Sequence, residues 1–139
     1  MVEFDAKDVR RYYDRYTDNF VNYGAGGRVG ALHRAVWTAE VKNPDQAFRY
    51  TENRLLKHLR TLPSEPPPHI VDLGCGVGGS LCYLATQLPI RGTGLTLSPV
   101  QVQHAEQRIH EAGLSNRITC IEADYCALPE AIPPADLAY

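Results

Sequence analysis

The sequence predicts an α/β protein in which an incomplete parallel sheet follows a helical N-terminal cap. Residues 69–73 read as a short apolar strand that leads directly into a cluster of glycines. Strand-like and helix-like segments then alternate as far as Tyr139, which is typical of a parallel sheet with helices on its faces. A proline-rich run, residues 63–68, separates this part from an N-terminal part with helical periodicity. We therefore expect a cap or lid over residues 1–65 and the sheet over residues 66–139.

The first predicted helix covers residues 5–22 and carries an aromatic stripe. Helical spacing places five apolar side chains along one side of it, with charged side chains on the remainder. Core packing is the better interpretation of most of them. The alternative is a helix that lies over a pocket and offers tyrosine hydroxyls and ring faces. The stripe consists of Val9, Tyr12, Tyr13, Tyr16 and Phe20.

A glycine-rich loop at residues 23–30 follows this helix and is expected to be mobile. Residues 31–40 then predict a short helix. It would place His33 and Trp37 on the same face, because they are four residues apart.

The last helix of the cap is predicted to begin at Asn43, with Pro44 in its first turn, and to run to about Leu62. Its apolar residues recur at helical spacing, so one face should be buried. That predicted face consists of Phe48, Thr51, Leu55, Leu59 and Leu62.

The segments after the prolines follow the order strand, helix, strand, helix, strand, and a fourth strand begins near the end. The second helix opens with Ser98, Pro99 and Gln101, a capping-box pattern. Ligands of parallel sheets bind beyond the carboxyl ends of the strands, so three loops should converge on one crevice. The strands are expected at 69–73, 91–97, 117–123 and from 135, the helices at 78–88 and 98–112, and the loops at 74–78, 96–98 and 124–125.

The glycine cluster fits two cofactor patterns. Residues 74–79 fit G-x-G-x-x-G, the dinucleotide pattern, and residues 72–78 fit D-x-G-x-G-x-G. The dinucleotide pattern expects an acid roughly 20 residues further on, to hold the ribose hydroxyls. The next strand, residues 91–97, contains no acid, which disfavours an NAD-dependent oxidoreductase. A purely structural glycine turn remains the third interpretation.

Composition excludes several classes of function. The net charge is −2, so the sequence has no excess of basic residues for binding nucleic acid. No apolar run is long enough for a membrane span. The N-terminus lacks the apolar core of a signal peptide. The four cysteines contain no C-x-x-C pair, so we expect reduced thiols in a cytoplasmic protein and no metal site.

Three segments carry a family resemblance: VDLGCGVGG, GTGLTLSPVQ and IEADYCALP. Together they resemble the first half of the class I S-adenosylmethionine-dependent methyltransferases, which implies a Rossmann-like fold. The segment GLTLSPVQ resembles the corresponding segment of a small-molecule subset that includes tocopherol-type C-methyltransferases and cyclopropane fatty acid synthases. HRAVW resembles the H-x-G-x-W segment of that subset, with Ala35 in place of glycine, and YYDRYTDNF resembles its tyrosine-rich cap helix.

The resemblance implies S-adenosylmethionine as cofactor and assigns the cofactor-binding residues. Asp72 would hold the amino group, the glycine backbone would lie against the methionine and ribose, and Asp124 with Tyr125 would contact the adenine. Thr96 stands where an acid is usual, so the ribose contact departs from the common pattern. The implied set is Asp72, Gly74, Cys75, Gly76, Gly78, Thr96, Leu97, Gln101, Asp124 and Tyr125.

The implied reaction is an in-line displacement at the sulfonium methyl by a small-molecule, natural-product or lipid-like acceptor. Such a reaction depends mainly on positioning and on the electrostatic environment. If the acceptor is oxygen or an acidic carbon, His33 is the candidate base. If it is an alkene carbon, aromatic rings could stabilise the cation. The rings are those of Tyr12, Tyr13, Tyr16 and Trp37.

The remaining histidines are expected to have no part in the reaction. His58, His104 and His110 fall on predicted helices away from the strand ends, and His69 starts the first strand at the opposite end of the sheet. Two alternatives to a methyltransferase stay open: an NAD-dependent oxidoreductase and a truncated, non-catalytic cofactor-binding fragment. The open edge of an incomplete sheet also allows a homo-oligomer.

Overall fold

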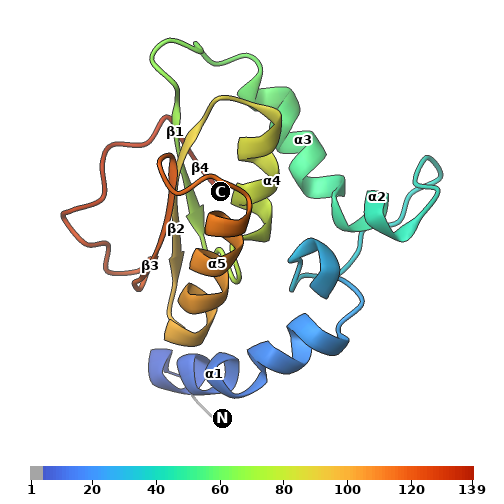
Figure 1. The fold of residues 1–139 in the computed structure, drawn as a ribbon, viewed down its shortest axis with the longest axis vertical. Coiled ribbons are helices and arrows are strands. Elements are labelled where there is room, and N and C mark those ends of the chain that lie inside the picture. Colours follow the sequence, from blue (N-terminus) through green and yellow to red (C-terminus); the bar gives the residue numbers. More distant parts are fainter. Residues whose placement is uncertain (1–4) are drawn as a thin grey trace.

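The computed structural model describes residues 5–139. Its centre is a four-stranded parallel sheet with the strand order β3-β2-β1-β4 (Figure 1). This sheet confirms the predicted fold class, although the fourth strand is shorter than expected. The strands are β1 (His69–Leu73), β2 (Arg91–Thr96), β3 (Ile118–Glu122) and β4 (Leu137–Ala138).

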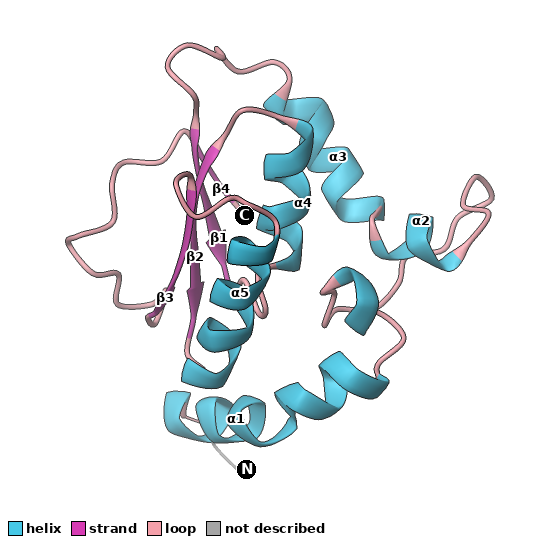
Figure 2. Cartoon of the chain, in the orientation of Figure 1, coloured by secondary structure: helices cyan, strands magenta, loops and turns pink. Residues whose placement is uncertain are grey.

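Two helices, α4 (Gly79–Gln87) and α5 (Pro99–Glu111), pack on the same face of the sheet (Figure 2). Side chains alternate between the two faces of a strand. Ile70 therefore joins the main core under the helices, whereas its neighbour Val71 joins a small cluster with Leu95 on the other face. That other face is covered by the long loop between β3 and β4 (Figure 2).

The cap begins with α1 (Ala6–Tyr23), which lies across the N-terminal end of α5 (Figure 1). Ser98 Oγ donates to Asp14 Oδ1 at 2.6 Å, and His104 Nε2 lies 2.7 Å from Asp18 Oδ1. Thr17 is the fully buried residue of α1. The helix thus docks through its polar side.

This docking contradicts core packing as the role of the aromatic stripe. Tyr12 is 50% exposed and Tyr13 is 36% exposed, while Tyr16 and Phe20 are half-buried. The rings pack mainly on one another: the Tyr12 and Tyr16 ring centroids are 5.1 Å apart. The physical reason is that α1 turns its polar side, and not its stripe, toward α5.

The predicted helix over residues 31–40 is wrong. After a 3-10 turn, η1 (Gly27–Val29), and a left-handed Gly30 with φ of 69°, this segment is irregular. Val36 N–H donates to the Ala47 carbonyl instead of to a helical partner. Valine, tryptophan and threonine are weak helix formers, so this tertiary hydrogen bond prevails. His33 and Trp37 therefore share no helical face, and Trp37 is 59% exposed.

The last predicted cap helix is divided into α2 (Pro44–Phe48) and α3 (Tyr50–Leu59). The break falls at Arg49, whose guanidinium donates to the Val29 carbonyl at 2.6 Å and the Gly79 carbonyl at 3.3 Å. Asn43 caps α2 as expected, because its side chain accepts from the Gln46 N–H. The division turns α3 so that Glu52 is buried, while Thr51 is exposed.

The cap and the sheet meet at bare backbone. A Cβ on Gly79, the first residue of α4, would overlap the Gly30 carbonyl. Glycine at this position thus lets the cap loop rest on the start of α4.

No helix among residues 5–139 is both long enough and apolar enough to cross a membrane.

Candidate functional site

Two adjoining cavities lie at the carboxyl end of β1, where the glycine loop begins. Each has a volume of about 370 Å³, which is in the range of small-molecule sites. The acidic cavity is lined by Glu52 and Asp72 among others, and the aromatic cavity by Tyr13 and Tyr125 among others. The two cavities share Leu32, His33, Gly74 and Gly76.

The glycine loop has two functions in the structure. Gly74 and Gly76 border both cavities with φ of 93° and 54°, a region that favours glycine. Gly78 borders neither cavity; a Cβ there would lie 3.1 Å from the Ala105 Cβ. Of the three glycines predicted to bind cofactor, two thus face the cavities and the third lets α4 and α5 pack closely.

Cys75 anchors the loop with its side chain. It borders the acidic cavity, but its sulfur lies 3.7 Å from the Cys120 sulfur in the sheet. A Cβ on Gly94 would approach the Cys75 Cβ to 2.8 Å, so glycine in β2 makes room for this side chain. The contact with Cys120 and burial both raise the pKa of the Cys75 thiol, which keeps it protonated. All four cysteines are free thiols.

Asp72 is a buried carboxylate that has no cationic hydrogen-bond partner within residues 5–139. It is 6% exposed, and its Oδ2 accepts from the Tyr139 hydroxyl at 3.2 Å. Burial raises the pKa of Asp72 to about 7, and the nearby Glu52 adds to the rise. A cation in the acidic cavity would therefore favour the ionised form.

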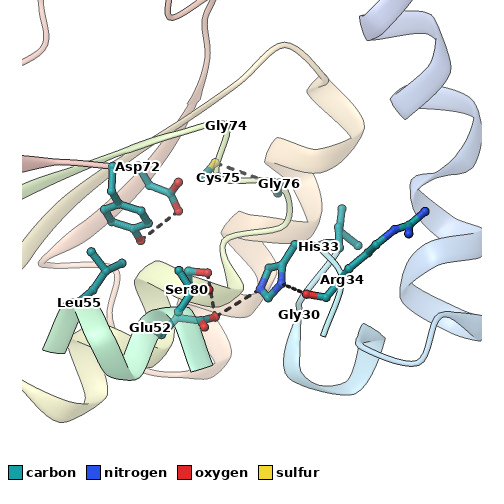
Figure 3. A pocket seen from close by; sticks show the side chains of 13 residues that line it. Gly30, His33, Arg34, Glu52, Leu55, Asp72, Gly74, Cys75, Gly76 and Ser80 are labelled. Carbon is teal, nitrogen blue, oxygen red and sulfur yellow. Dashed lines mark hydrogen bonds and ion pairs between the residues drawn. The ribbon is translucent and has the colours of Figure 1, made fainter. Parts of the chain in front are cut away.

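Glu52 is one of the residues of this site that the sequence analysis missed. It is 1% exposed and lies on α3 facing the acidic cavity (Figure 3). Its Oε1 accepts from Ser80 Oγ at 3.0 Å and from Arg49 Nη1 at 3.2 Å. The signal that could have found it is its i, i+4, i+7 spacing with Leu56 and Leu59, which are buried.

His33 lies at the border of the two cavities. Its Nδ1 is 3.0 Å from the Arg34 carbonyl, and its Nε2 is 3.7 Å from Glu52 Oε1 (Figure 3). The carbonyl accepts a hydrogen bond from Nδ1–H, so the neutral ring has its lone pair on Nε2. A proton taken up at Nε2 would be stabilised by the Glu52 carboxylate.

The aromatic cavity brings together six of the predicted cofactor residues, namely Gly74, Gly76 and four others. Thr96 Oγ1 donates to Gln101 Oε1 at 2.6 Å, and both residues are buried. Leu97 and Tyr125 line the same cavity.

The predicted capping box is only half formed. Ser98 Oγ accepts from the Gln101 N–H, but the Gln101 side chain turns to Thr96.

Other predicted residues lie outside the two cavities. Asp124 accepts the Cys126 N–H at 2.8 Å and lines a separate hollow with Lys7 and Arg10. Of the predicted cap aromatics, Tyr13 reaches a cavity; the lining does not include Tyr12, Tyr16 or Trp37.

The remaining histidines lie away from the cavities. His69 is buried at the amino end of β1, where it contacts Thr93 and the Pro134 carbonyl. His58 and His110 are exposed. Residues 5–139 contain no cluster of three or more potential metal ligands.

Comparison with known proteins gives a consistent result. The model of the methyltransferase domain family matches residues 70–139. The chain is 31% identical over 135 residues to an O-methyltransferase of Pyrenophora dematioidea, covering 96% of this chain and 49% of that protein. It is 40% identical over 67 residues to a probable chloroplastic tocopherol O-methyltransferase of Oryza sativa subsp. japonica, covering 48% of this chain and 18% of that protein.

Among solved structures, the cyclase SpnF superposes with a TM-score of 0.81 at 27% identity, covering 99% of this chain and 49% of that one. The chain spans about half the length of this cyclase and of the Pyrenophora protein.

Proposed function

The chain belongs to the methyltransferase domain family, and from this premise we propose that it binds S-adenosylmethionine and takes part in methyl transfer to a small molecule. The observation that carries the proposal is the position of the glycine loop. Gly74 and Gly76 border two cavities of unlike chemistry, one aromatic and one acidic. S-adenosylmethionine has two such unlike ends, a nucleoside and an amino acid that carries a cationic ammonium and an anionic carboxylate beside the cationic sulfonium.

We assign the adenosine end to the aromatic cavity. Tyr125 offers a ring face to the adenine, and Thr96 with Gln101 offers a hydroxyl and an amide to the ribose. Leu97 supplies apolar contact for the base. Asp124 is left out of this assignment, because its carboxylate accepts the Cys126 N–H outside the cavity.

The cationic end is assigned to the acidic cavity. Asp72 would accept from the ammonium group, which supplies the cation that this buried carboxylate lacks. The sulfonium methyl then lies near the shared border, beside His33.

The acceptor is proposed to be a hydroxyl group, as the name of the Pyrenophora relative suggests. The neutral His33 takes the hydroxyl proton at Nε2 while the oxygen attacks the methyl in line with the sulfur. Glu52, 3.7 Å away, stabilises the imidazolium that forms. The exposed rings of Tyr12 and Trp37, with the half-buried ring of Tyr16, form part of the acceptor surface in this proposal.

The NAD-dependent alternative has less support. An acid at the end of β2 would be needed for the ribose hydroxyls. Thr96, which has no carboxylate, stands there instead.

Thermal unfolding of the chain with saturating S-adenosylhomocysteine or NADH tests the cofactor. A ligand at 100 times its Kd stabilises the folded state by about 2.7 kcal/mol, which raises the Tm by several degrees. We expect this rise with S-adenosylhomocysteine and none with NADH. A rise with NADH alone would contradict the proposal.

Turnover with a panel of hydroxyl acceptors, followed by release of S-adenosylhomocysteine, tests the transfer step. Since the fold is shared with a cyclase, binding alone does not establish methyl transfer. We expect His33→Asn to bind cofactor like the wild type and to lose turnover. Binding without turnover in the wild type would instead favour the cofactor-binding fragment.

A further inference from the structure

Glu52, in the wall of the acidic cavity, carries a buried oxygen that has no hydrogen-bond partner among the described residues. Among residues 5–139, its Oε2 has no hydrogen-bond partner, although the side chain is only 2% exposed. Buried polar atoms are nearly always hydrogen-bonded, and a buried carboxylate oxygen without a donor is costly. A donor that binds in this cavity would remove that cost.

The contacts of Glu52 leave Oε2 free for such a donor. Ser80 and Arg49 both donate to Oε1, and His33 also faces Oε1. Arg49 divides its donors between this carboxylate and the carbonyls of Val29 and Gly79. Within the described residues, none of the guanidinium N–H groups of Arg49 reaches Oε2.

The two carboxylates in the wall of the acidic cavity are compensated unequally. Glu52 pairs with Arg49 through Oε1, whereas among residues 5–139 the side-chain donor to Asp72 is the neutral Tyr139 hydroxyl. Arg34 borders the cavity, but its side chain extends away from the two carboxylates (Figure 3). Two buried carboxylates facing one space favour a bound cation.

We propose that Glu52 Oε2 binds the α-ammonium group of S-adenosylmethionine, which lies between Glu52 and Asp72. This inference rests on the proposed function and adds a cap residue to the cofactor site. An ammonium has three N–H donors and can satisfy both carboxylates at once. The sulfonium has no N–H and cannot donate to Oε2.

The assignment also gives the cap a function in binding. Glu52 belongs to α3, whereas Asp72 and Ser80 belong to β1 and α4. The ammonium would therefore join the cap to the sheet through charge-assisted hydrogen bonds.

The test is calorimetric binding of two probes to the wild type and to Glu52→Gln. S-adenosylhomocysteine contains the ammonium, and methylthioadenosine lacks the amino-acid end. Glutamine keeps an oxygen for Ser80 but removes the charge. We expect a tenfold to hundredfold weaker Kd for S-adenosylhomocysteine, because the variant removes one partner of a buried charge pair; this is about 1.4–2.7 kcal/mol. Methylthioadenosine should bind within about twofold of the wild type.

Glu106→Gln is the matched control, because Glu106 is exposed on α5 and borders neither cavity. It should leave both Kd values unchanged. Failure of the wild type to bind S-adenosylhomocysteine contradicts the proposed function itself. If the wild type binds S-adenosylhomocysteine and Glu52→Gln binds it with the same Kd, the inference is overturned. An equal loss of affinity for both probes overturns it as well. A loss for S-adenosylmethionine but not for S-adenosylhomocysteine would assign Glu52 to the sulfonium and overturn it as well.

A second variant keeps the inference testable if Glu52→Gln does not fold. Glu52→Asp retains the charge but withdraws the oxygens by one methylene. It should weaken S-adenosylhomocysteine at least fivefold and leave methylthioadenosine unchanged. Equal binding of both probes to this variant and to the wild type would contradict the inference.

Discussion

The acidic and the aromatic cavity share the glycine loop but are completed in different ways. The acidic cavity is closed by buried charged residues from the cap and the sheet, Glu52 and Asp72. The aromatic cavity is bordered by partly exposed rings, since Tyr13 is 36% and Tyr125 is 53% exposed. Charge buried in a low-dielectric wall discriminates strongly between ligands, whereas an open aromatic wall discriminates mainly by shape.

The difference indicates how the two ends of one ligand are recognised. The acidic cavity should distinguish ligands with and without an ammonium group. The aromatic cavity should bind every adenosine-containing ligand about equally. Variants in the shared loop, in the acidic cavity and in the aromatic cavity should therefore differ in which of the two ligands they bind more weakly.

The largest effect is expected from Gly74→Val in the shared loop. Valine at a φ of 93° is strained, so the loop must move, and both cavities change with it. Affinity for S-adenosylhomocysteine should fall by at least about 100-fold, and methylthioadenosine should be affected similarly. Isothermal titration measures both.

Gly113→Val is the matched control for that strain. Gly113 also has a positive φ, 68°, and a Cβ at either glycine would meet nothing within 4 Å. Both variants should lose similar stability in thermal unfolding, but only Gly74→Val should lose binding. If Gly74→Val and Gly113→Val bound S-adenosylhomocysteine equally well, the glycine loop would not be part of the ligand site.

Asp72→Asn should produce the second largest effect, and it is specific to the acidic cavity. Because burial raises the pKa of Asp72 to about 7 from 3.8, the folded state holds this proton between those values. Stability therefore falls as pH rises from about 4 to 7. A bound ammonium favours the carboxylate, so affinity for S-adenosylhomocysteine should rise about tenfold from pH 6 to 8. The Asn variant should bind more weakly and show no such rise.

His33 borders both cavities, so its contribution must be controlled. The pH series is therefore repeated in His33→Gln, which should keep the rise that Asp72 causes. If the rise disappears with His33 and persists in Asp72→Asn, then Asp72 is not the group that binds the ammonium.

Thr96→Val tests the aromatic cavity with a smaller expected effect. The variant leaves Gln101 Oε1 buried without its donor at 2.6 Å. Both S-adenosylhomocysteine and methylthioadenosine should lose about tenfold in affinity, unlike the response to Glu52→Gln. Thr86→Val, on the exposed side of α4, should leave both unchanged. A loss confined to S-adenosylhomocysteine would place Thr96 at the wrong end of the ligand.

The smallest effect is expected from Tyr125→Ala. Because this ring is half exposed, its removal should weaken methylthioadenosine and S-adenosylhomocysteine by only about threefold. Tyr23→Ala removes a more exposed ring outside both cavities and serves as the control. A loss of affinity above about thirtyfold would show that the aromatic cavity does not contribute less to binding than the acidic cavity.

The sheet could be predicted closely from the sequence, because its signals are local. Apolar runs, the glycine turn and the Ser98 N-cap each determine an element without help from distant residues. β1 begins and ends where the sequence indicated, at His69 and Leu73. The convergence of Gly74, Thr96 and Tyr125 then followed from the geometry of parallel strands.

The cap could not be predicted as well, because its conformation depends on tertiary contacts. The Val36 N–H pairs with Ala47, and Arg49 interrupts a continuous helix to reach two carbonyls. Neither contact has a local sequence signal. Glu52 was missed for a related reason, since glutamate is rarely buried unless it is paired. Only its spacing with Leu56 and Leu59 indicated the buried face.

The most direct test of the two-cavity arrangement is a crystal structure of this chain with S-adenosylhomocysteine. We expect the adenine in the aromatic cavity beside Tyr125, and the ammonium within hydrogen-bond distance of Asp72 and Glu52 Oε2. The ligand in the reverse orientation, or in neither cavity, would contradict the assignment of the glycine loop as the centre of the cofactor site.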